Sequence, residues 1–432
     1  MMNPRKLALD LLIKAEKNDQ FSNIALDRAL LDSGMSEPDR ALCSILFYGV
    51  IEKRITLDYR LAALSSRPLC DLEPIPMTAL RLGLYQLEYL DRIPPHAAIY
   101  ETVALCPKKS AGFVNAVLRS HQRTEKTPLP DKDTAPVRHL SVRHSVGEPL
   151  VEKLLSIFSF DRCDALLASF SHNPPITLRV NTLKTDRGTL ALHIEGATPT
   201  ALSPNGLHVR GTLRALYGFE DGLFFVQDEA SQICVEALGA TRGDRMLDIC
   251  SCPGSKSFGS ALRMENVGEI HAFDLHEKKL SLVVSGAQKL GITILDTRAH
   301  DGRDFMPEWE GGADRVLCDV PCSGFGVVAK KPELRYKDPA VSAALPDIQL
   351  AILETASRYV KAGGTLVYST CTIFPEENEE NVARFLATHP DFSLTPFRVG
   401  ALDCPAGQIT LLPDCHGTDG FFIAKLTKKD TP

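Results

Sequence analysis

The stretch RMLDICSCPGSKS, residues 245–257, places a short apolar run before a loop of small residues. The apolar run has the length and composition of a buried strand, and Pro253, Gly254 and Ser255 are typical of a tight turn. A helix that begins near Lys256 would point its free backbone N–H groups into this turn. Strand, turn and helix in this order form a ligand-binding unit in many α/β proteins, although a turn with a purely structural role stays an alternative.

The same alternation of strand and helix continues through the rest of the chain. Amphipathic helices are predicted over residues 276–290 and 346–360. Further strands are predicted over EIHAFD (269–274), ITILDT (292–297), RVLCDV (315–320), GTLVYST (364–370) and FFIAKL (421–426). Repeated strand–helix units predict a Rossmann-like α/β fold with a mostly parallel sheet, which binds ligands at the carboxyl ends of its strands.

An acidic residue marks the end of the second predicted strand. Asp274 lies 20 residues after Gly254, the spacing at which an acid binds a ribose diol in such folds. The turn lacks the G-x-G-x-x-G pattern of dinucleotide enzymes, so it would not hold a pyrophosphate closely and a nucleotide-dependent oxidoreductase is disfavoured. A ligand with a ribose and no phosphates, such as S-adenosyl-L-methionine, fits this loop better.

Two cysteines follow the ends of two later strands. Cys322 lies in DVPCSGFG (319–326), and Cys371 lies in YSTCTIFPEENEENV (368–382). The carboxyl ends of adjacent parallel strands meet at one edge of a sheet, so we expect both thiols beside the ligand loop. Buried cysteines without a chemical function are one alternative.

A zinc site is a second alternative for the cysteines. It would use Cys250, Cys252, Cys318 and Cys322. The spacings C-x-C and C-x₃-C are not those of a zinc knuckle, and Cys318 is expected to face the core, so we expect no metal.

Paired thiols beside an acid suit the methylation of a pyrimidine. Carbon-5 of cytosine is too electron-poor to take a methyl group directly, and a thiolate that adds to carbon-6 makes carbon-5 nucleophilic. A second group must then remove the carbon-5 proton so that the first thiolate can leave, and an acid beside the ring can stabilise the adduct. Asp319, Cys322 and Cys371 can supply these three functions.

The motifs together resemble those of RNA (cytosine-5-)-methyltransferases. They are DICSCPGSKS, AFDLHEKKL, DVPCSGFGV, YSTCTIFPEENEENV and FFVQDEASQ. With FVNAVLR (113–119) and a helical first segment, the chain is similar to the RsmB/Sun branch, whose amino-terminal domain is NusB-like and binds RNA. The resemblance covers nearly the whole chain. It implies a class I S-adenosyl-L-methionine-dependent methyltransferase domain with a mostly parallel seven-stranded sheet.

The resemblance also implies roles for single residues. The nucleophile of the family falls on Cys371, and the cysteine that serves product release falls on Cys322, whereas DNA cytosine methyltransferases use the cysteine of their Pro-Cys motif as the nucleophile. Asp319 and Lys256 complete the implied catalytic set. The implied cofactor contacts are Cys250, Ser251, Cys252, Pro253, Gly254, Ser255, Lys256, Asp274, Asp301 and Asp319.

The chain departs from the family pattern at a few positions. Ser255 replaces the second glycine of C-A-A-P-G-G-K, and it would cost on the order of 1 kcal/mol if that position needs a positive φ. Phe325 and Thr372 replace a threonine and a serine that are common in the family, and both concern the pocket wall. Every residue that makes or breaks a bond is present, so we expect an active enzyme.

Four segments are expected along the chain. Residues 1–123 form an all-helical NusB-like domain that binds RNA, and residues 124–138 form a polar, proline-rich linker. Residues 139–214 form a small α+β connector, and residues 215–432 form the methyltransferase domain. In the helical segment the expected helix starts are Ser22, Ser36 and Thr56.

Charge is distributed unevenly over the 432 residues. The net charge is +2 for residues 1–123, +2 for residues 124–214 and −10 for residues 215–432. Because the chain is not strongly basic, RNA contacts must come from local patches or a shaped pocket. Two basic clusters are candidates, although a solvated face is the simpler interpretation of each: Lys108, Lys109, Arg119 and Arg123, and Lys330, Lys331, Arg335 and Lys337.

Composition predicts a cytoplasmic protein that does not enter a membrane. The sequence has no apolar run of about 18 residues and no secretory signal at its start. Twelve cysteines without regular spacing suggest reduced thiols.

We therefore expect an enzyme that transfers a methyl group from S-adenosyl-L-methionine to carbon-5 of a cytosine in structured RNA. The expected substrate is small-subunit (16S) ribosomal RNA, and the protein is expected to act as a monomer. One alternative is an RNA-binding or ribosome-assembly factor with weak or no activity, and another is the same chemistry on transfer RNA.

Overall fold

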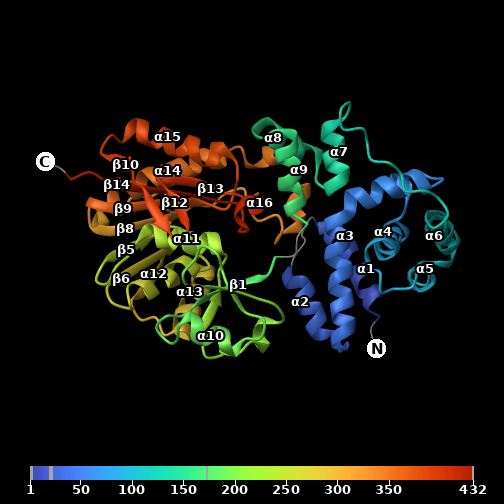
Figure 1. Cartoon of the computed structure of the whole chain (residues 1–432), viewed down its shortest axis with the longest axis horizontal. Coiled ribbons are helices and arrows are strands. Elements are labelled where there is room, and N and C mark those ends of the chain that lie inside the picture. The colour runs from blue at the N-terminus through green and yellow to red at the C-terminus, as the bar shows by residue number, and fades with distance from the viewer. Residues whose placement is uncertain (1–2, 19–22, 172–173, 431–432) are drawn as a thin grey trace. The chain divides into compact units, whose positions relative to one another are not determined.

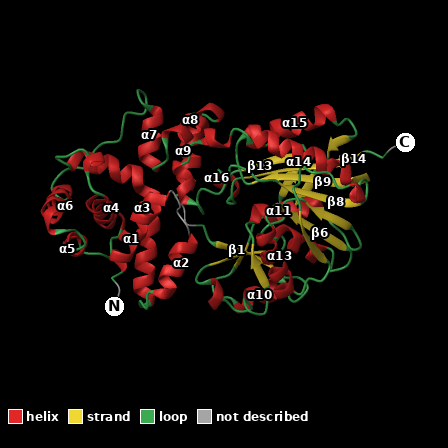
Figure 2. Cartoon of the chain, turned by 180° about the vertical axis from the view of Figure 1, so that it is seen from behind, coloured by secondary structure: helices red, strands yellow, loops and turns green. Residues whose placement is uncertain are grey.

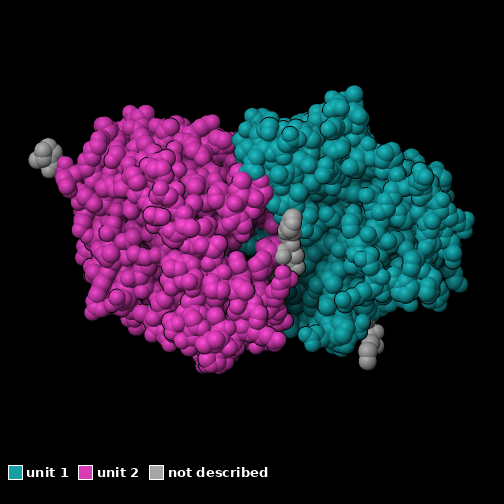
Figure 3. Space-filling model, in the orientation of Figure 1, with its two compact units in different colours: residues 1–171, 330–339 teal, residues 172–329, 340–432 magenta. Residues whose placement is uncertain are grey.

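The computed structural model describes residues 3–18, 23–171 and 174–430. The chain divides into two compact units, which Figure 3 shows in different colours. Unit 1 comprises Met1–Ser171 and Lys330–Pro339, and unit 2 comprises His172–Ala329 and Ala340–Pro432. None of the helices in the described ranges is long and apolar enough to cross a lipid bilayer.

Unit 1 is helical, as predicted for the first part of the chain (Figure 1). Its helices are α1 (Pro4–Asn18), α2 (Asn23–Asp32), α3 (Glu37–Leu64), α4 (Pro74–Tyr89), α5 (Pro95–Val103), α6 (Lys108–His121), α7 (Pro136–His144), α8 (Glu148–Ile157) and α9 (Phe160–Ser169). Ser36 caps α3 by accepting a hydrogen bond from the N–H of Asp39, as expected. The expected start at Thr56 is wrong, because Thr56 lies inside α3 and donates to the carbonyl of Val142 at 2.6 Å. Ser22 lies outside the described residues.

The segment Lys330–Pro339 follows the Cys322 loop in sequence and folds with the helices of unit 1. Arg335 is fully buried there, and its guanidinium donates to the carbonyls of His144, at 3.2 Å, and of Phe170. The N–H of Gly147 donates in turn to the carbonyl of Arg335 at 2.7 Å. Arg335 therefore does not belong to the expected basic surface cluster, because its charge satisfies backbone carbonyls inside the unit.

Unit 2 contains a small antiparallel sheet and a large mixed sheet (Figure 2). The small sheet has the order β2-β3-β1-β4, with β1 (Ile176–Val180), β2 (Thr198–Pro199), β3 (Gly206–Val209) and β4 (Phe224–Val226), and α10 (Arg187–His193) follows β1. The predicted connector, 139–214, is thus divided between the units. Its helical part joins α3 through Thr56, whereas Arg179 of β1 is buried against Glu236 of α11 at 2.8 Å.

The large sheet has the strand order β10-β14-β9-β8-β5-β6-β7, and β13 also pairs with β14. Its strands are β5 (Arg245–Asp248), β6 (Glu269–Asp274), β7 (Leu295–Ala299), β8 (Ala313–Asp319), β9 (Val360–Thr370), β10 (Phe392–Leu394), β13 (Gln408–Leu411) and β14 (Phe421–Lys428). Strands β5 to β9 are parallel, and β14 runs antiparallel to β9. The strands β11 (Phe397–Val399) and β12 (Leu402–Cys404) form a separate pair. The predicted mostly parallel Rossmann-like sheet is confirmed, but the predicted number of seven strands is wrong, because the pairing of β13 with β14 makes it eight-stranded in the described residues.

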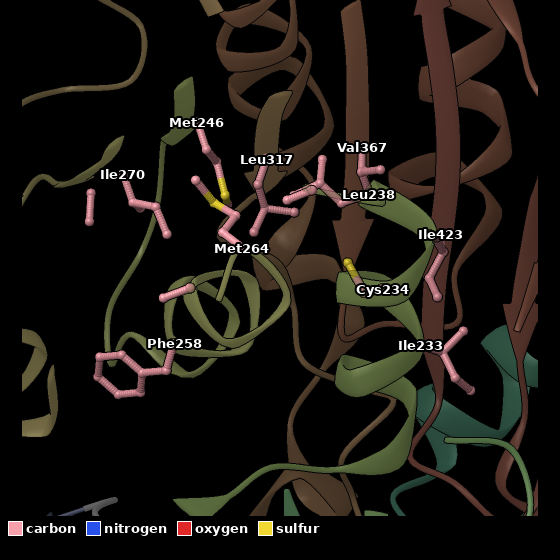
Figure 4. Packing of buried hydrophobic residues seen from close by; sticks show 14 of the residues in the cluster. Ile233, Cys234, Leu238, Met246, Phe258, Met264, Ile270, Leu317, Val367 and Ile423 are labelled. Carbon is pink, nitrogen blue, oxygen red and sulfur yellow. The ribbon is translucent and has the colours of Figure 1, made fainter. Parts of the chain in front are cut away.

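Helices cover both faces of this sheet. Because successive side chains of a strand point to opposite faces, neighbouring residues pack against different helix layers. Helices α11 (Glu229–Leu238), α12 (Ser255–Arg263) and α13 (Glu277–Leu290) share one core with Leu317 and Val367. Helices α14 (Leu345–Tyr359) and α15 (Glu379–Thr388) share the opposite core with Cys318 and Tyr368. Figure 4 shows Leu317, Val367 and Ile423 of three strands beside Leu238, Cys234 and Ile233 of α11.

The strand order reverses at β5, which pairs with β6 on one side and with β8 on the other. The loops after β5 and β8 therefore lead away from each other and leave a crevice at the carboxyl ends of the strands, where open α/β sheets bind ligands. The turn around Gly254 follows β5, and the Cys322 loop follows β8.

Arg335 gives a test of the role of its segment in unit 1. We expect Arg335→Ala to lower the free energy of unfolding by about 3 kcal/mol, because two buried carbonyls lose their donor. Thermal or denaturant unfolding measures this loss. The exposed neighbour Lys337 supplies the control, and Lys337→Ala should change stability by less than about 0.5 kcal/mol. Equal stability of the two variants would contradict this assignment.

Candidate active site

Cys322 and Cys371 meet at the carboxyl edge of the large sheet. The parallel pairing of β8 with β9 sets Asp319 opposite Ser369, and Cys322 follows three residues after Asp319 while Cys371 follows two residues after Ser369. The two Sγ atoms lie 3.1 Å apart, and the N–H of Cys371 donates to the Cys322 sulfur at 3.2 Å. Both sulfurs are thiols. The expected convergence of the two strand ends is confirmed.

Two glycines after Cys322 allow this approach. Gly324 has φ +80°, which a residue with a side chain rarely adopts. A Cβ on Gly326 would overlap the carbonyl of Gly420 and come within 2.7 Å of the carbonyl of Cys371. The N–H of Gly326 donates to that Cys371 carbonyl at 2.9 Å, and the N–H of Gly420 donates to the Gly326 carbonyl at 2.8 Å. The Cys322 loop is therefore held directly against the backbone that carries Cys371.

Asp319 and Lys256 form an ion pair beside the thiols. The Lys256 Nζ lies 2.6 Å from one carboxylate oxygen of Asp319, and the hydroxyl of Ser369 donates to the other at 2.8 Å. Burial alone would lower the pKa of Lys256, but the charges of Asp319, Cys234 and Cys371 outweigh it and raise that pKa. Lys256 thus stays a cation at neutral pH and holds Asp319 in one orientation.

The two thiols are not electrostatically equivalent. The pKa of Cys322 is raised well above its ordinary value, first by its hydrogen bond to Cys371, then by burial and by the charges of Cys371 and Glu377. Cys322 therefore keeps its proton and can donate it toward Cys371. Lys256, the buried cation paired with Asp319, is attracted to a negative charge on Cys371.

The turn after β5 has the conformation of a ligand cradle. Gly254 has φ +102°, and a Cβ there would lie 2.7 Å from the ring of Phe258 and 3.1 Å from Val283. Ser255 is the first residue of α12 and has no positive φ. The conformational cost expected for Ser255 is therefore absent, because the left-handed position falls on Gly254.

Two acids stand at the ends of neighbouring strands near this turn. Asp274 ends β6, and its carboxylate accepts from the N–H of Cys252 at 3.3 Å and of His276 at 2.9 Å. Asp301 follows β7, and hydrogen bonds from Arg303 lower its pKa to about 2. The N–H that precedes Asp301 donates to the Asp274 carbonyl at 3.0 Å, so both acids lie at one edge.

This edge fits the adenosyl group that the motifs predict. The cradle at Gly254 tolerates no side chain, and the hydroxyl of Ser251 and the amide oxygen of Gln227 are buried without a hydrogen-bond partner. Gln227 donates to the Ser255 carbonyl at 3.1 Å and so anchors the start of α12. Polar atoms without partners beside a glycine-shaped turn and an acid are what a ribose and an amino-acid group require.

The zinc alternative does not fit the positions of its cysteines. Cys318 is buried in the core between β8 and α14, and burial raises its pKa and that of Cys250 well above the ordinary value. Within the described ranges no three His, Cys, Asp or Glu side chains are arranged to hold a metal ion.

Three polar residues of the site were not singled out from the sequence. Ser369 binds Asp319, and Asp248 at the end of β5 accepts from the Ser257 hydroxyl at 2.5 Å. Burial raises the pKa of Asp248 to about 7. Glu377 follows a proline and another acid, a pattern typical of an exposed helix start, but its side chain is buried. The one signal for Ser369 and Asp248 is a polar residue at the end of an otherwise apolar strand.

The chain is similar to known methyltransferases over nearly its whole length. The family described as 16S rRNA methyltransferase RsmB/F matches residues 235–427, and the NusB family matches residues 2–123. The chain is 38% identical to the probable ribosomal RNA small subunit methyltransferase B of Bacillus subtilis, over 98% of both chains. It belongs to that methyltransferase family. The family resemblance inferred from the motifs is thereby confirmed, and with it a SAM-dependent methyltransferase.

Other relatives agree with this membership. Ribosomal RNA small subunit methyltransferase B of Klebsiella pneumoniae is 33% identical over 99% of both chains. The crystal structure of PH0851 has a TM-score of 0.78 and 25% identity over 99% of both chains. A methyltransferase homologue from Pyrococcus horikoshii has a TM-score of 0.59 and 26% identity over 68% of this chain and 99% of its own.

Gly326 tests the close approach of the two loops in this RsmB/F-family site. We expect Gly326→Ala to lower the free energy of unfolding by about 2 kcal/mol or more, because the Cβ overlaps backbone atoms that cannot move aside cheaply. The control is Gly112→Ala on an open face of α6, which should be neutral or stabilising by up to about 1 kcal/mol. A Gly326→Ala protein as stable as the wild type would show that the approach is not tight.

Proposed function

We propose that this rRNA methyltransferase transfers the methyl group of S-adenosyl-L-methionine to carbon-5 of a cytosine in small-subunit ribosomal RNA. The reaction passes through a covalent bond between Cys371 and the base. The observation that carries the proposal is the pair of thiols at 3.1 Å beside the Lys256–Asp319 ion pair. A single thiol with an acid could attack the base, whereas a pair of thiols can supply one group for attack on the base and another for release of the product.

The charges around the thiols support Cys371 as the nucleophile. The Cys371 sulfur can accept a hydrogen bond from the thiol of Cys322. It also lies near the Lys256 cation, which favours a negative charge on the Cys371 sulfur. Attack on carbon-6 forms a carbon–sulfur bond and pushes electrons toward the N3 side of the ring. Asp319, held by Lys256 and Ser369, orients that side of the base.

Release then depends on Cys322. Bonding of Cys371 to carbon removes its negative charge, and with it the largest cause of the raised Cys322 pKa. Cys322 can now lose its proton to solvent. After methylation it takes the carbon-5 proton while the Cys371–carbon bond breaks, which restores the aromatic ring and a Cys371 thiolate.

The edge beside Gly254 is the proposed cofactor site. S-adenosyl-L-methionine supplies an electrophilic methyl group on a sulfonium. Asp274 would bind the ribose hydroxyls, Asp301 the adenine side, and the residues from Cys250 to Lys256 the remainder. Ser255 has an ordinary helical backbone, so it gives no conformational reason for weak cofactor binding. The alternative of an assembly factor with weak activity therefore loses its support from this residue. The names of the relatives favour ribosomal over transfer RNA. A monomer in the cytoplasm stays a prediction.

Substitution of the thiols tests the two roles. With labelled cofactor and small-subunit rRNA, Cys371→Ala should abolish methyl transfer, because nothing else activates carbon-5. Cys322→Ala should form a covalent protein–RNA adduct that persists on a denaturing gel. The exposed Cys415 gives the control, and Cys415→Ala should act like the wild type. Transfer that survives in Cys371→Ala would remove the assigned nucleophile.

Calorimetry tests the cofactor site separately. S-adenosyl-L-methionine should bind the wild type, and Asp274→Asn should bind it roughly 10- to 100-fold more weakly, the usual loss for a hydrogen bond to a charged group. Asp296→Asn, an exposed acid on β7, is the matched control. No heat of binding in the wild type would favour the assembly-factor alternative, and unchanged affinity in Asp274→Asn would contradict its role.

A further inference from the structure

A buried carboxylate connects the two cysteine loops. Glu377 ends the short 3₁₀ turn Pro375–Glu377, six residues after Cys371, and its side chain is 1% exposed. Its Oε2 accepts a hydrogen bond from the backbone N–H of Ser323 at 2.9 Å. Ser323 directly follows Cys322 in sequence. The segment that carries one thiol thus holds the backbone of the segment that carries the other.

Gln349 of α14 completes this hold on the Cys322 loop. Its amide nitrogen donates to the same Oε2 of Glu377 at 2.8 Å and to the carbonyl of Pro321 at 3.0 Å. The carbonyl before Cys322 and the N–H after it are therefore both fixed, one by Gln349 and the other by Glu377. A residue bracketed in this way has little freedom to move its sulfur.

The rest of the network reaches the strand that leads to Cys371. The hydroxyl of Tyr368, three residues before Cys371, donates to the carbonyl of Glu377 at 2.6 Å. Asn381 of α15 donates to the amide oxygen of Gln349 at 3.2 Å. Tyr368, Gln349 and Asn381 are fully buried, and each of their side-chain polar atoms has a hydrogen-bond partner. Networks of this kind allow one arrangement of their members.

The choice of a carboxylate at this position needs an explanation beyond stability. Burial of a charged group is costly unless an opposite charge or several hydrogen bonds compensate. In the described part of the chain no basic side chain forms an ion pair with Glu377. Two N–H groups donate hydrogen bonds to its Oε2. A carboxylate oxygen accepts such hydrogen bonds more strongly than the oxygen of a neutral amide does. The charge also lies close enough to Cys322 to favour the protonated thiol.

We propose that Glu377 is a positioning residue for Cys322, which fixes that sulfur opposite Cys371 and governs release of the methylated base rather than attack on it. The inference rests on the proposed function, since it assumes that Cys371 attacks and Cys322 releases. With its side chain 1% exposed, Glu377 is assigned no contact with substrate or cofactor. It acts directly on the backbone after Cys322 and, through Gln349, on the backbone before it.

The test compares Glu377→Gln with Glu379→Gln. Glu379 lies two residues further on and accepts from the Thr410 hydroxyl at 2.6 Å, away from the Cys322 loop. With rRNA and cofactor, Glu377→Gln should form the covalent adduct as fast as the wild type but resolve it on the order of 10- to 100-fold more slowly, the usual loss for a misplaced group. Adduct should therefore accumulate in Glu377→Gln and not in Glu379→Gln.

A double variant separates positioning from a general loss of structure. If Glu377 acts through Cys322, then adding Glu377→Gln to Cys322→Ala should leave the amount of adduct unchanged. Further loss of adduct in the double variant would overturn the proposal, as would normal turnover of Glu377→Gln. A folded Glu377→Gln protein that forms no adduct would also overturn it, because attack would then be impaired.

A second variant covers the case in which Glu377→Gln does not fold. Gln349→Leu removes the donors to Pro321 and Glu377 but keeps the carboxylate, and it should slow adduct resolution in the same direction. Unfolding of both variants would mean a structural role and overturn the proposal. Failure of the proposed function looks different, since Cys322→Ala would then accumulate no adduct or Cys371→Ala would still transfer methyl.

Discussion

The parallel pairing of β8 with β9 is the constraint on which the site depends. It sets Asp319 opposite Ser369, and the N–H of Val320 extends the pairing by donating to the Ser369 carbonyl at 3.1 Å. Two apolar layers hold this register, because Leu317 and Val367 face one layer while Cys318 and Tyr368 face the other. A slip of one residue would exchange these faces and bury the wrong side chains. Core packing thus determines the distance between two thiols that lie outside the core.

The charged and polar groups at the strand ends are accommodated at little cost because each has a partner close by. Lys256 and Asp319 are paired at 2.6 Å, and Ser369 satisfies the second oxygen of the carboxylate. At the point where the strand order reverses, the loops after β5 and β8 part, and this ion pair lies at the crevice between them. In such a partly dry place a fixed cation acts more strongly on a nearby sulfur than it would in water.

Local patterns of the sequence were sufficient for much of the fold and for part of the site. Apolar runs gave β6 with its observed bounds, and the parallel arrangement placed Cys322 and Cys371 at one edge. Long-range contacts were beyond such patterns. Thr56 has the residue type of a helix start, but it lies inside α3, where its hydroxyl donates to the carbonyl of Val142, far along the chain.

Arg335 and Ser255 show the same limit of local patterns. Arg335 stands in a basic run that is typical of a surface, yet its partners are the carbonyls of His144 and Phe170. Ser255 departs from the family pattern without a conformational cost, because the left-handed residue is its neighbour Gly254. Glu377 has the signature of an acid at a helix start, and only the folded chain reveals that Ser323 and Gln349 are its partners. The partners of a buried polar side chain are set by tertiary structure, which sequence spacing does not encode.

The different surroundings of the two thiols explain how one sequence pattern can support two roles. Both cysteines follow a parallel strand, so their positions in the sequence are nearly equivalent. The structure makes them unequal through charge: the Lys256 cation lies near Cys371, and the buried Glu377 carboxylate lies near Cys322. A cation favours the thiolate that attacks, and an anion favours the thiol that keeps its proton until the attack is complete. Because Lys256 is held by Asp319 at the end of β8 and Glu377 by Ser323 after Cys322, the geometry that brings the sulfurs together also supports the proposed order in which they act.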